Sequence, residues 1–138
     1  MRQGRMIIRG FVLVLLAGSM LGGVASARDS LVVKIKRHAT LREGGQVVNV
    51  KVKVACDPAR GEVLEAFVYV TQDGNESDFA GIPVVCDNKL RTYKVRVAAF
   101  PESPLRRGKA RASAYVLQVD PVTEETTSGQ DTRIILIR

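Results

Sequence analysis

From Val48 onward, the segment that ends at Cys56 has an apolar residue at every second position. These positions are Val48, Val50, Val52, Val54 and Cys56. Strict alternation built from β-branched residues is typical of a β-strand with one buried face and one face in solvent. A single strand cannot bury such a face alone, so the segment predicts two pleated layers with an apolar interior between them.

Six further segments are predicted to be extended, and none of them repeats its apolar residues with a helical period. Together with residues 46–56, the expected strands are residues 31–41, 63–72, 80–86, 90–99, 109–119 and 132–137. Turn-forming residues separate them, and residues 120–131 are expected to form a long Thr-rich, acidic loop. Short strands with a turn every 8–12 residues or so predict an all-β fold, an immunoglobulin-like antiparallel β-sandwich of seven strands.

The first 27 residues have the organisation of a secretory signal peptide. Three arginines form its positive start, residues 11–21 form its apolar centre, and an Ala-x-Ala cleavage pattern ends at Ala27. The alternative is a retained membrane anchor, but residues 11–21 are too few to cross a hydrocarbon core of about 30 Å. The mature domain, residues 28–138, is therefore expected to be secreted and not bound to a membrane after cleavage.

The two cysteines, Cys56 and Cys86, are predicted to form one disulfide, because exported chains mature in an oxidising compartment. Two free thiols are the alternative. In an up-and-down arrangement, the strands that end at Cys56 and Cys86 run in the same direction. Their ends then lie at the same end of the sandwich, where a bridge is geometrically possible.

Four short motifs carry a resemblance to a known family: residues 52–58, 68–72, 86–88 and 108–110. With these motifs the chain resembles an uncharacterised family of small secreted actinobacterial proteins that have an immunoglobulin-like β-sandwich. The resemblance extends over essentially the whole mature chain and implies its fold and its export. It implies no activity, cofactor or site residue.

The sequence offers no catalytic constellation and predicts no enzymatic activity. Its one histidine, His38, is expected on an outward strand face, and nucleophilic catalysis would require a nucleophile and an orienting group beside it. Two cysteines and one histidine cannot complete an ordinary zinc site without carboxylates. No cofactor and no metal are therefore predicted.

The turn from Asp73 to Asp78 places oxygen-bearing side chains at alternate positions, as calcium loops do. It lacks the glycine expected at the sixth position, and the twelfth position is Val84 rather than glutamate. Calcium binding and an ordinary hairpin turn are the two alternatives.

A basic face is predicted on the outward side of residues 31–41, 46–56 and 90–99, if these strands share one sheet as in other sandwiches. Its members are Lys34, Lys36, Lys51, Lys53, Lys94 and Arg96. Without the three signal arginines, 18 of the 21 basic residues remain against 14 acidic ones, a formal charge of +4. We expect salt-sensitive contact with an anionic envelope polymer, without recognition of a nucleic-acid sequence. The alternative is that these residues are the polar half of the alternation and protect the sheet edge.

An aromatic face is predicted on the opposite sheet, with Phe67, Tyr69, Tyr115 and Leu117 at its outer positions. A contiguous apolar patch on a small exported domain often marks a protein interface or a self-association surface. The alternative is a one-residue slip in register, which would exchange the buried and exposed faces.

The sequence thus predicts a secreted, non-catalytic binding domain whose partner is an anionic envelope polymer or another extracellular protein. The alternative function is a structural protein of the extracellular layer that associates with itself.

Overall fold

The computed structural model describes residues 31–138, and the expected signal peptide, residues 1–27, lies outside the described residues. Nine strands follow one another without an α-helix between residues 31 and 138. They are β1 (Leu31–Ile35), β2 (His38–Arg42), β3 (Val47–Cys56), β4 (Glu62–Gln72), β5 (Asn75–Glu76), β6 (Ala80–Gly81), β7 (Arg91–Ala98), β8 (Gly108–Val119) and β9 (Thr126–Ile137). Two short 3-10 turns, η1 (Glu43–Gly45) and η2 (Pro58–Arg60), flank β3.

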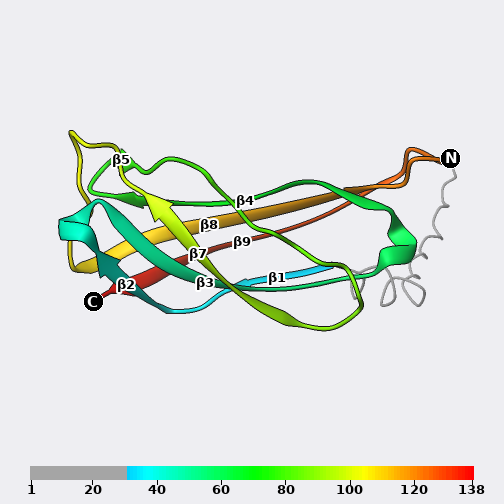
Figure 1. Cartoon of the computed structure of the whole chain (residues 1–138), viewed down its shortest axis with the longest axis horizontal. Coiled ribbons are helices and arrows are strands. Elements are labelled where there is room, and N and C mark those ends of the chain that lie inside the picture. Colours follow the sequence, from blue (N-terminus) through cyan, green and yellow to red (C-terminus); the bar gives the residue numbers. More distant parts are fainter. Residues whose placement is uncertain (1–30) are drawn as a thin grey trace, which may run out of the picture. The chain divides into compact units, whose positions relative to one another are not determined.

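Two antiparallel ladders make up the fold (Figure 1). In the first, β3 pairs with β1 on one side and β7 on the other. In the second, β8 lies between β9 and β4, and the short strands β5 and β6 pair with β4. Strand β2 joins the ladders, because it pairs antiparallel with β3 and parallel with β9.

The prediction of an all-β fold is confirmed, but the strands within residues 31–138 number nine rather than seven and form one mixed sheet. The expected first strand, residues 31–41, is two strands that are separated at residues 36–37. After this break β2 still pairs with β3 but also reaches β9, where Leu136 N donates to Arg37 O. The parallel pairing of β2 with β9 makes the purely antiparallel prediction wrong.

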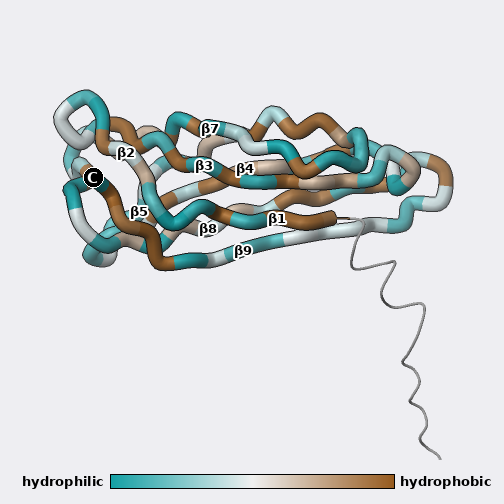
Figure 2. Tube along the Cα trace, turned by 90° about the horizontal axis from the view of Figure 1, so that it is seen from below, coloured by the Kyte–Doolittle hydropathy of each residue, from teal (hydrophilic) through white to brown (hydrophobic). Residues whose placement is uncertain are grey.

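The buried side chains of both ladders form one core cluster. Strand β3 contributes the alternating valines at 48, 50, 52 and 54, each with no exposed surface. Strand β8 contributes Ala110, Ala112, Ala114 and Val116, and β4 contributes Val68 and Val70. Figure 2 shows the hydrophobic and hydrophilic residues alternating along these strands. Since Val68 and Val70 are buried, Phe67 and Tyr69 take the outer face of β4.

Two of the expected strands are interrupted or shortened, each for a local reason. A bulge between Val63 and Glu65 interrupts the alternation of β4, so that Leu64 is 66% exposed. Residues 82–90 are irregular, and the expected strand at 80–86 is reduced to β6. Pro83 in this segment has no N–H to donate to a ladder.

The second half of the expected loop at residues 120–131 is strand, because β9 pairs with β8 all the way from Thr126 to Ile137. Only the turn at residues 120–125 remains. There the Asp120 carboxylate accepts hydrogen bonds from the N–H groups of Val122 and Thr123, at 2.9 and 3.3 Å. These bonds stabilise the ionised carboxylate and lower the pKa of Asp120 below its ordinary value.

The predicted disulfide between Cys56 and Cys86 is confirmed, with a Cα–Cα distance of 4.7 Å. It ties the end of β3 to the irregular segment at residues 82–90. Asn88 N also donates to Cys56 O at 2.9 Å. Beside the bridge, Arg91 donates to the Asp87 carboxylate and holds the pKa of Asp87 below its ordinary value.

We predict that replacing both cysteines by alanine lowers the free energy of unfolding by about 3.5 kcal/mol, because the bridge closes a loop with a sequence separation of 30. Urea titration followed by circular dichroism measures the change. The control is Asp87→Asn, which removes the ion pair with Arg91 beside the bridge but keeps the bridge, and should cost far less than the double variant. A loss below about 1 kcal/mol in the double variant would contradict the prediction.

Candidate functional site

The six residues of the predicted basic face lie on the outer side of the β1–β3–β7 ladder. Lys34 is directly opposite Lys53 in the pairing of β1 with β3, and Lys51 is directly opposite Lys94 in the pairing of β3 with β7. Lys36 lies beside Lys51, since Lys36 N donates to Lys51 O at 2.9 Å. Directly opposite residues in an antiparallel pair have Cβ atoms about 5 Å apart. The fold therefore gathers lysines from three strands into one surface.

Most of this charge is not neutralised by the part of the chain that the structure describes. Arg96, opposite Asn49 on β3, forms an ion pair with Glu43 of η1. The other five cations have no carboxylate of residues 31–138 within 4.0 Å of their nitrogen atoms. Like charges directly opposite each other destabilise a sheet.

The alternative to polymer binding is that the lysines protect a sheet edge, and the position of β3 in the sheet tests it. Lys94 is on β7, which pairs only with β3, and edge protection accounts for a charge there. Lys53 on β3 is paired with β1 on one side and β7 on the other, and Lys51 is paired with β7 and accepts a hydrogen bond from Lys36 N on its other side. Protection of an edge does not account for cations on a central strand.

A hollow of about 380 Å³ extends the basic face toward β2 and the end of β9. Lys51 and Lys94 line it together with Arg42, Arg138 and His38. Thr40 and Asn49 add a hydroxyl and an amide, and no acidic side chain of the described residues lines this hollow. We call it the basic hollow.

Sequence reasoning did not find the basic hollow. Arg42 was expected in a turn, and Arg138 follows the last strand without any local signal. The parallel pairing of β2 with β9 brings them together, because Arg138 N donates to Ala39 O and Leu41 N donates to Arg138 O, at 3.0 and 2.8 Å. His38, which is exposed, lies in the same hollow.

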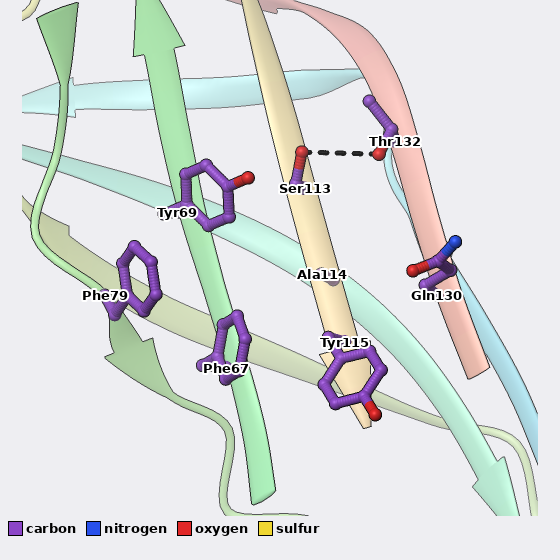
Figure 3. A pocket seen from close by; sticks show the side chains of 8 residues that line it. All are labelled: Phe67, Tyr69, Phe79, Ser113, Ala114, Tyr115, Gln130 and Thr132. Atoms are coloured by element: carbon purple, nitrogen blue, oxygen red, sulfur yellow. Dashed lines mark hydrogen bonds between the residues drawn. The ribbon is translucent and has the colours of Figure 1, made fainter. Parts of the chain in front are cut away.

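The predicted aromatic face is on the outer side of β4 and β8 (Figure 3). Phe67 and Tyr115 are paired in register, with ring centroids 5.6 Å apart. Leu117 is opposite Glu65, one register row away, and does not line the pocket next to the aromatic rings.

The structure adds Phe79, which sequence reasoning missed. Its ring stacks on Phe67 at 5.0 Å and on Tyr69 at 4.7 Å, although it lies between β5 and β6 rather than on either long strand. No alternation marks this short segment. The cluster of Phe67, Tyr69, Phe79 and Tyr115 is called the aromatic cluster below.

The turn from Asp73 to Asp78 does not bring its oxygen atoms together. Asp73 forms an ion pair with Arg106. Ser77 is buried, and its hydroxyl accepts from Val70 N at 2.8 Å and donates to Asp78 O at 3.0 Å. Within residues 31–138, no group of three or more His, Cys, Asp or Glu side chains is placed to hold a metal ion.

No helix of the described residues is both long and apolar enough to cross a membrane. No protein-family model, no curated protein and no solved structure matches this chain. The resemblance to secreted actinobacterial proteins therefore stays a hypothesis, and the candidate site stands on its own geometry.

We predict that Lys51→Gln raises the free energy of unfolding by about 0.5 kcal/mol in low salt, because it relieves repulsion from Lys94 and Lys36. The difference should vanish near 1 M NaCl, where charges are screened within about 3 Å. Urea titrations at both salt concentrations measure it. The control is Lys89→Gln, which removes a cation from an exposed turn and should have a smaller effect. A Lys51→Gln variant that is less stable than the native protein in low salt would contradict this account.

Proposed function

We propose that the protein is an exported, non-catalytic binding protein whose basic face holds an anionic polymer of the cell envelope. The observation that carries this proposal is the pair of directly opposed lysines, Lys51 and Lys94, on a central strand and its neighbour. Neither has a carboxylate partner among residues 31–138. A bound polyanion would supply the missing negative charge.

The spacing of the cations suits a polymer better than a small ion. Lys51 and Lys53 are two residues apart on β3, which corresponds to about 6.6 Å along the strand, and their cross-strand neighbours lie about 5 Å away. A two-dimensional array of this kind can contact several charges of a chain at once. Each contact releases a counterion from the polymer, which makes such binding strong in low salt and independent of sequence.

The basic hollow adds a recess to this flat surface. Arg42 and Arg138 bring guanidinium groups, which can donate two parallel hydrogen bonds to a phosphate, sulfate or carboxylate. Lys51 and Lys94 belong to both the face and the hollow. A polymer that crosses the face can therefore place one of its anionic groups in the hollow.

The architecture and the disulfide support the rest of the proposal. Two ladders enclose one core, which supports a sandwich of the immunoglobulin-like kind, and β2 contacts both ladders. The bridge between Cys56 and Cys86 is typical of proteins from oxidising compartments, which agrees with export through the predicted signal peptide.

Self-association into an extracellular layer is the alternative function. It would use the outer face of β4, β8 and β9, where Phe79, Ile134 and Leu136 are 55%, 52% and 39% exposed. Sedimentation over a wide range of protein concentrations tests it. A monomer throughout would count against it.

We predict that the protein, purified after expression of the full chain, binds heparin in low salt. Replacing Lys51, Lys53, Lys94 and Arg96 by glutamine should reduce the slope of log affinity against log salt concentration by about 3, since each phosphate-like contact contributes about 0.7–0.9. Fluorescence polarisation with labelled heparin at several NaCl concentrations measures this slope.

The matched control removes four cations outside the basic face: Lys89, Arg107, Lys109 and Arg111, each replaced by glutamine. Both variants lose the same net charge. Equal losses of affinity would show that net charge alone attracts heparin, and unchanged binding in the first variant would show that the basic face is not the site. Either result overturns the proposal.

A further inference from the structure

A second pocket, of about 360 Å³, lies on the outer face of β4, β8 and β9 (Figure 3). The aromatic cluster forms one side of it, and Ser113, Gln130 and Thr132 provide its polar groups. No charged side chain of the described residues lines it. We propose that this pocket binds a neutral saccharide, with a pyranose ring packed against the aromatic cluster.

Two adjacent register rows shape the pocket. The rows are Phe67–Tyr115–Gln130 and Tyr69–Ser113–Thr132. Because the short side chain of Ser113 stands between larger neighbours, it leaves space above β8. The volume lies at the lower end of the range of about 300–1,000 Å³ for small-molecule sites. The pocket is therefore large enough for a sugar unit and open along the face of the sheet.

The aromatic side chains present flat surfaces that are held in place. Phe79 stacks on Phe67 and on Tyr69 with interplanar angles of 15° and 17°, so the three rings are close to parallel. Figure 3 shows Phe79 on the side of β4 that faces away from β8. Phe67 lies between Phe79 and Tyr115, whereas Tyr69 is supported by Phe79 on one side and can accept a ligand on the other, where it is paired with the small Ser113. The C–H bonds on a pyranose face are polarised by neighbouring oxygens and are attracted to the negative face of an aromatic ring.

The polar groups beside the rings match the hydroxyl groups of a sugar. The hydroxyls of Ser113 and Thr132 are 3.3 Å apart, which is a long contact that a ligand can replace. The side-chain amide of Gln130 is exposed and makes no hydrogen bond to another group of residues 31–138. Hydroxyl and amide groups both donate and accept, as sugar hydroxyls do.

The same groups disfavour other occupants. An apolar segment of a protein, or a second copy of this chain bound through its own apolar residues, would bury the groups of Ser113, Thr132 and Gln130 without hydrogen-bond partners. A charged ligand would find no counter-charge in the pocket. The charged residues of β4 and β8 on this face, Glu65 and Arg111, lie outside it, in the next register row at each end. A neutral, hydroxyl-rich ligand with an apolar face avoids both costs.

The test is a titration of the purified protein with cellotetraose, chitotetraose, maltotetraose and mannotetraose, together with an array of neutral glycans. The chain has no tryptophan and three tyrosines, of which Tyr69 and Tyr115 line the pocket, so tyrosine fluorescence reports binding directly. We expect saturable binding of at least one neutral saccharide that persists at about 0.5 M NaCl, where ionic contacts are screened. If no saccharide binds, the proposal is overturned.

Two variants test the two halves of the pocket. Phe79→Ala removes an exposed ring that supports the aromatic faces and should weaken binding about tenfold without loss of folding, checked by circular dichroism. Thr132→Val keeps the shape and removes the hydroxyl, and should weaken binding about threefold. Phe100→Ala, which removes an exposed ring outside the pocket, is the control and should bind normally.

Other outcomes identify a different occupant. Self-association that Phe79→Ala abolishes and Thr132→Val strengthens would assign the pocket to a second copy of the chain and overturn the proposal. Saccharide binding that equals the native level in both pocket variants would place the sugar elsewhere and also overturn it. The heparin experiment tests residues of β3 and β7, which are on the other ladder. Either proposal can therefore fail while the other holds.

Discussion

The burial of alternate valines on β3 is the constraint on which the rest of the structure depends. Val48, Val50, Val52 and Val54 have no exposed surface, and β3 is paired on both sides. Burying one such side chain contributes about 1.5–3 kcal/mol, whereas one pair of opposed like charges costs about 0.2–1 kcal/mol. The core therefore fixes the register of β1 and β7 against β3, and that register places Lys51 opposite Lys94. The fold tolerates this pair but does not require lysine at either position, since any polar residue would satisfy the outward alternation.

Much of this arrangement could be predicted from the sequence, because alternation is a local signal. It located β3, β7 and β8, assigned the valines to the core, and gathered the basic residues on one face. It could not predict that residues 31–41 divide into β1 and β2, since this depends on hydrogen bonds between Ala39 and the far end of the chain. The basic hollow was missed for the same reason. Its Arg42 and Arg138 are almost one hundred residues apart, and only the parallel β2–β9 pairing joins them.

The length of β9 and the place of Phe79 show a second limit of the pattern. Residues 126–131 are polar and small, and were expected in a loop, yet they pair with β8 in an unbroken register. Gly129 in this segment faces β1 so closely that a Cβ atom there would lie 3.1 Å from side-chain atoms of Leu31 and Val33. Where a strand contacts its neighbour through a glycine instead of an apolar side chain, the sequence has no apolar alternation to detect. Phe79 lies outside any long strand, so its contribution to the aromatic cluster follows from tertiary packing alone.

The two proposed sites lie on opposite outer faces, with the shared core between them. Packed β-layers are about 10 Å apart, and each site faces away from the other, so one short ligand segment cannot contact both. Their physical chemistry also differs, because the affinity of the basic face for its ligand depends on ionic strength and that of the aromatic pocket does not. Occupation of one site therefore leaves the other accessible. Together the two proposals describe a domain that holds an anionic polymer on one side and a neutral saccharide on the other. If both ligands belong to the same envelope, the two weak contacts are joined by a rigid sheet structure and act together.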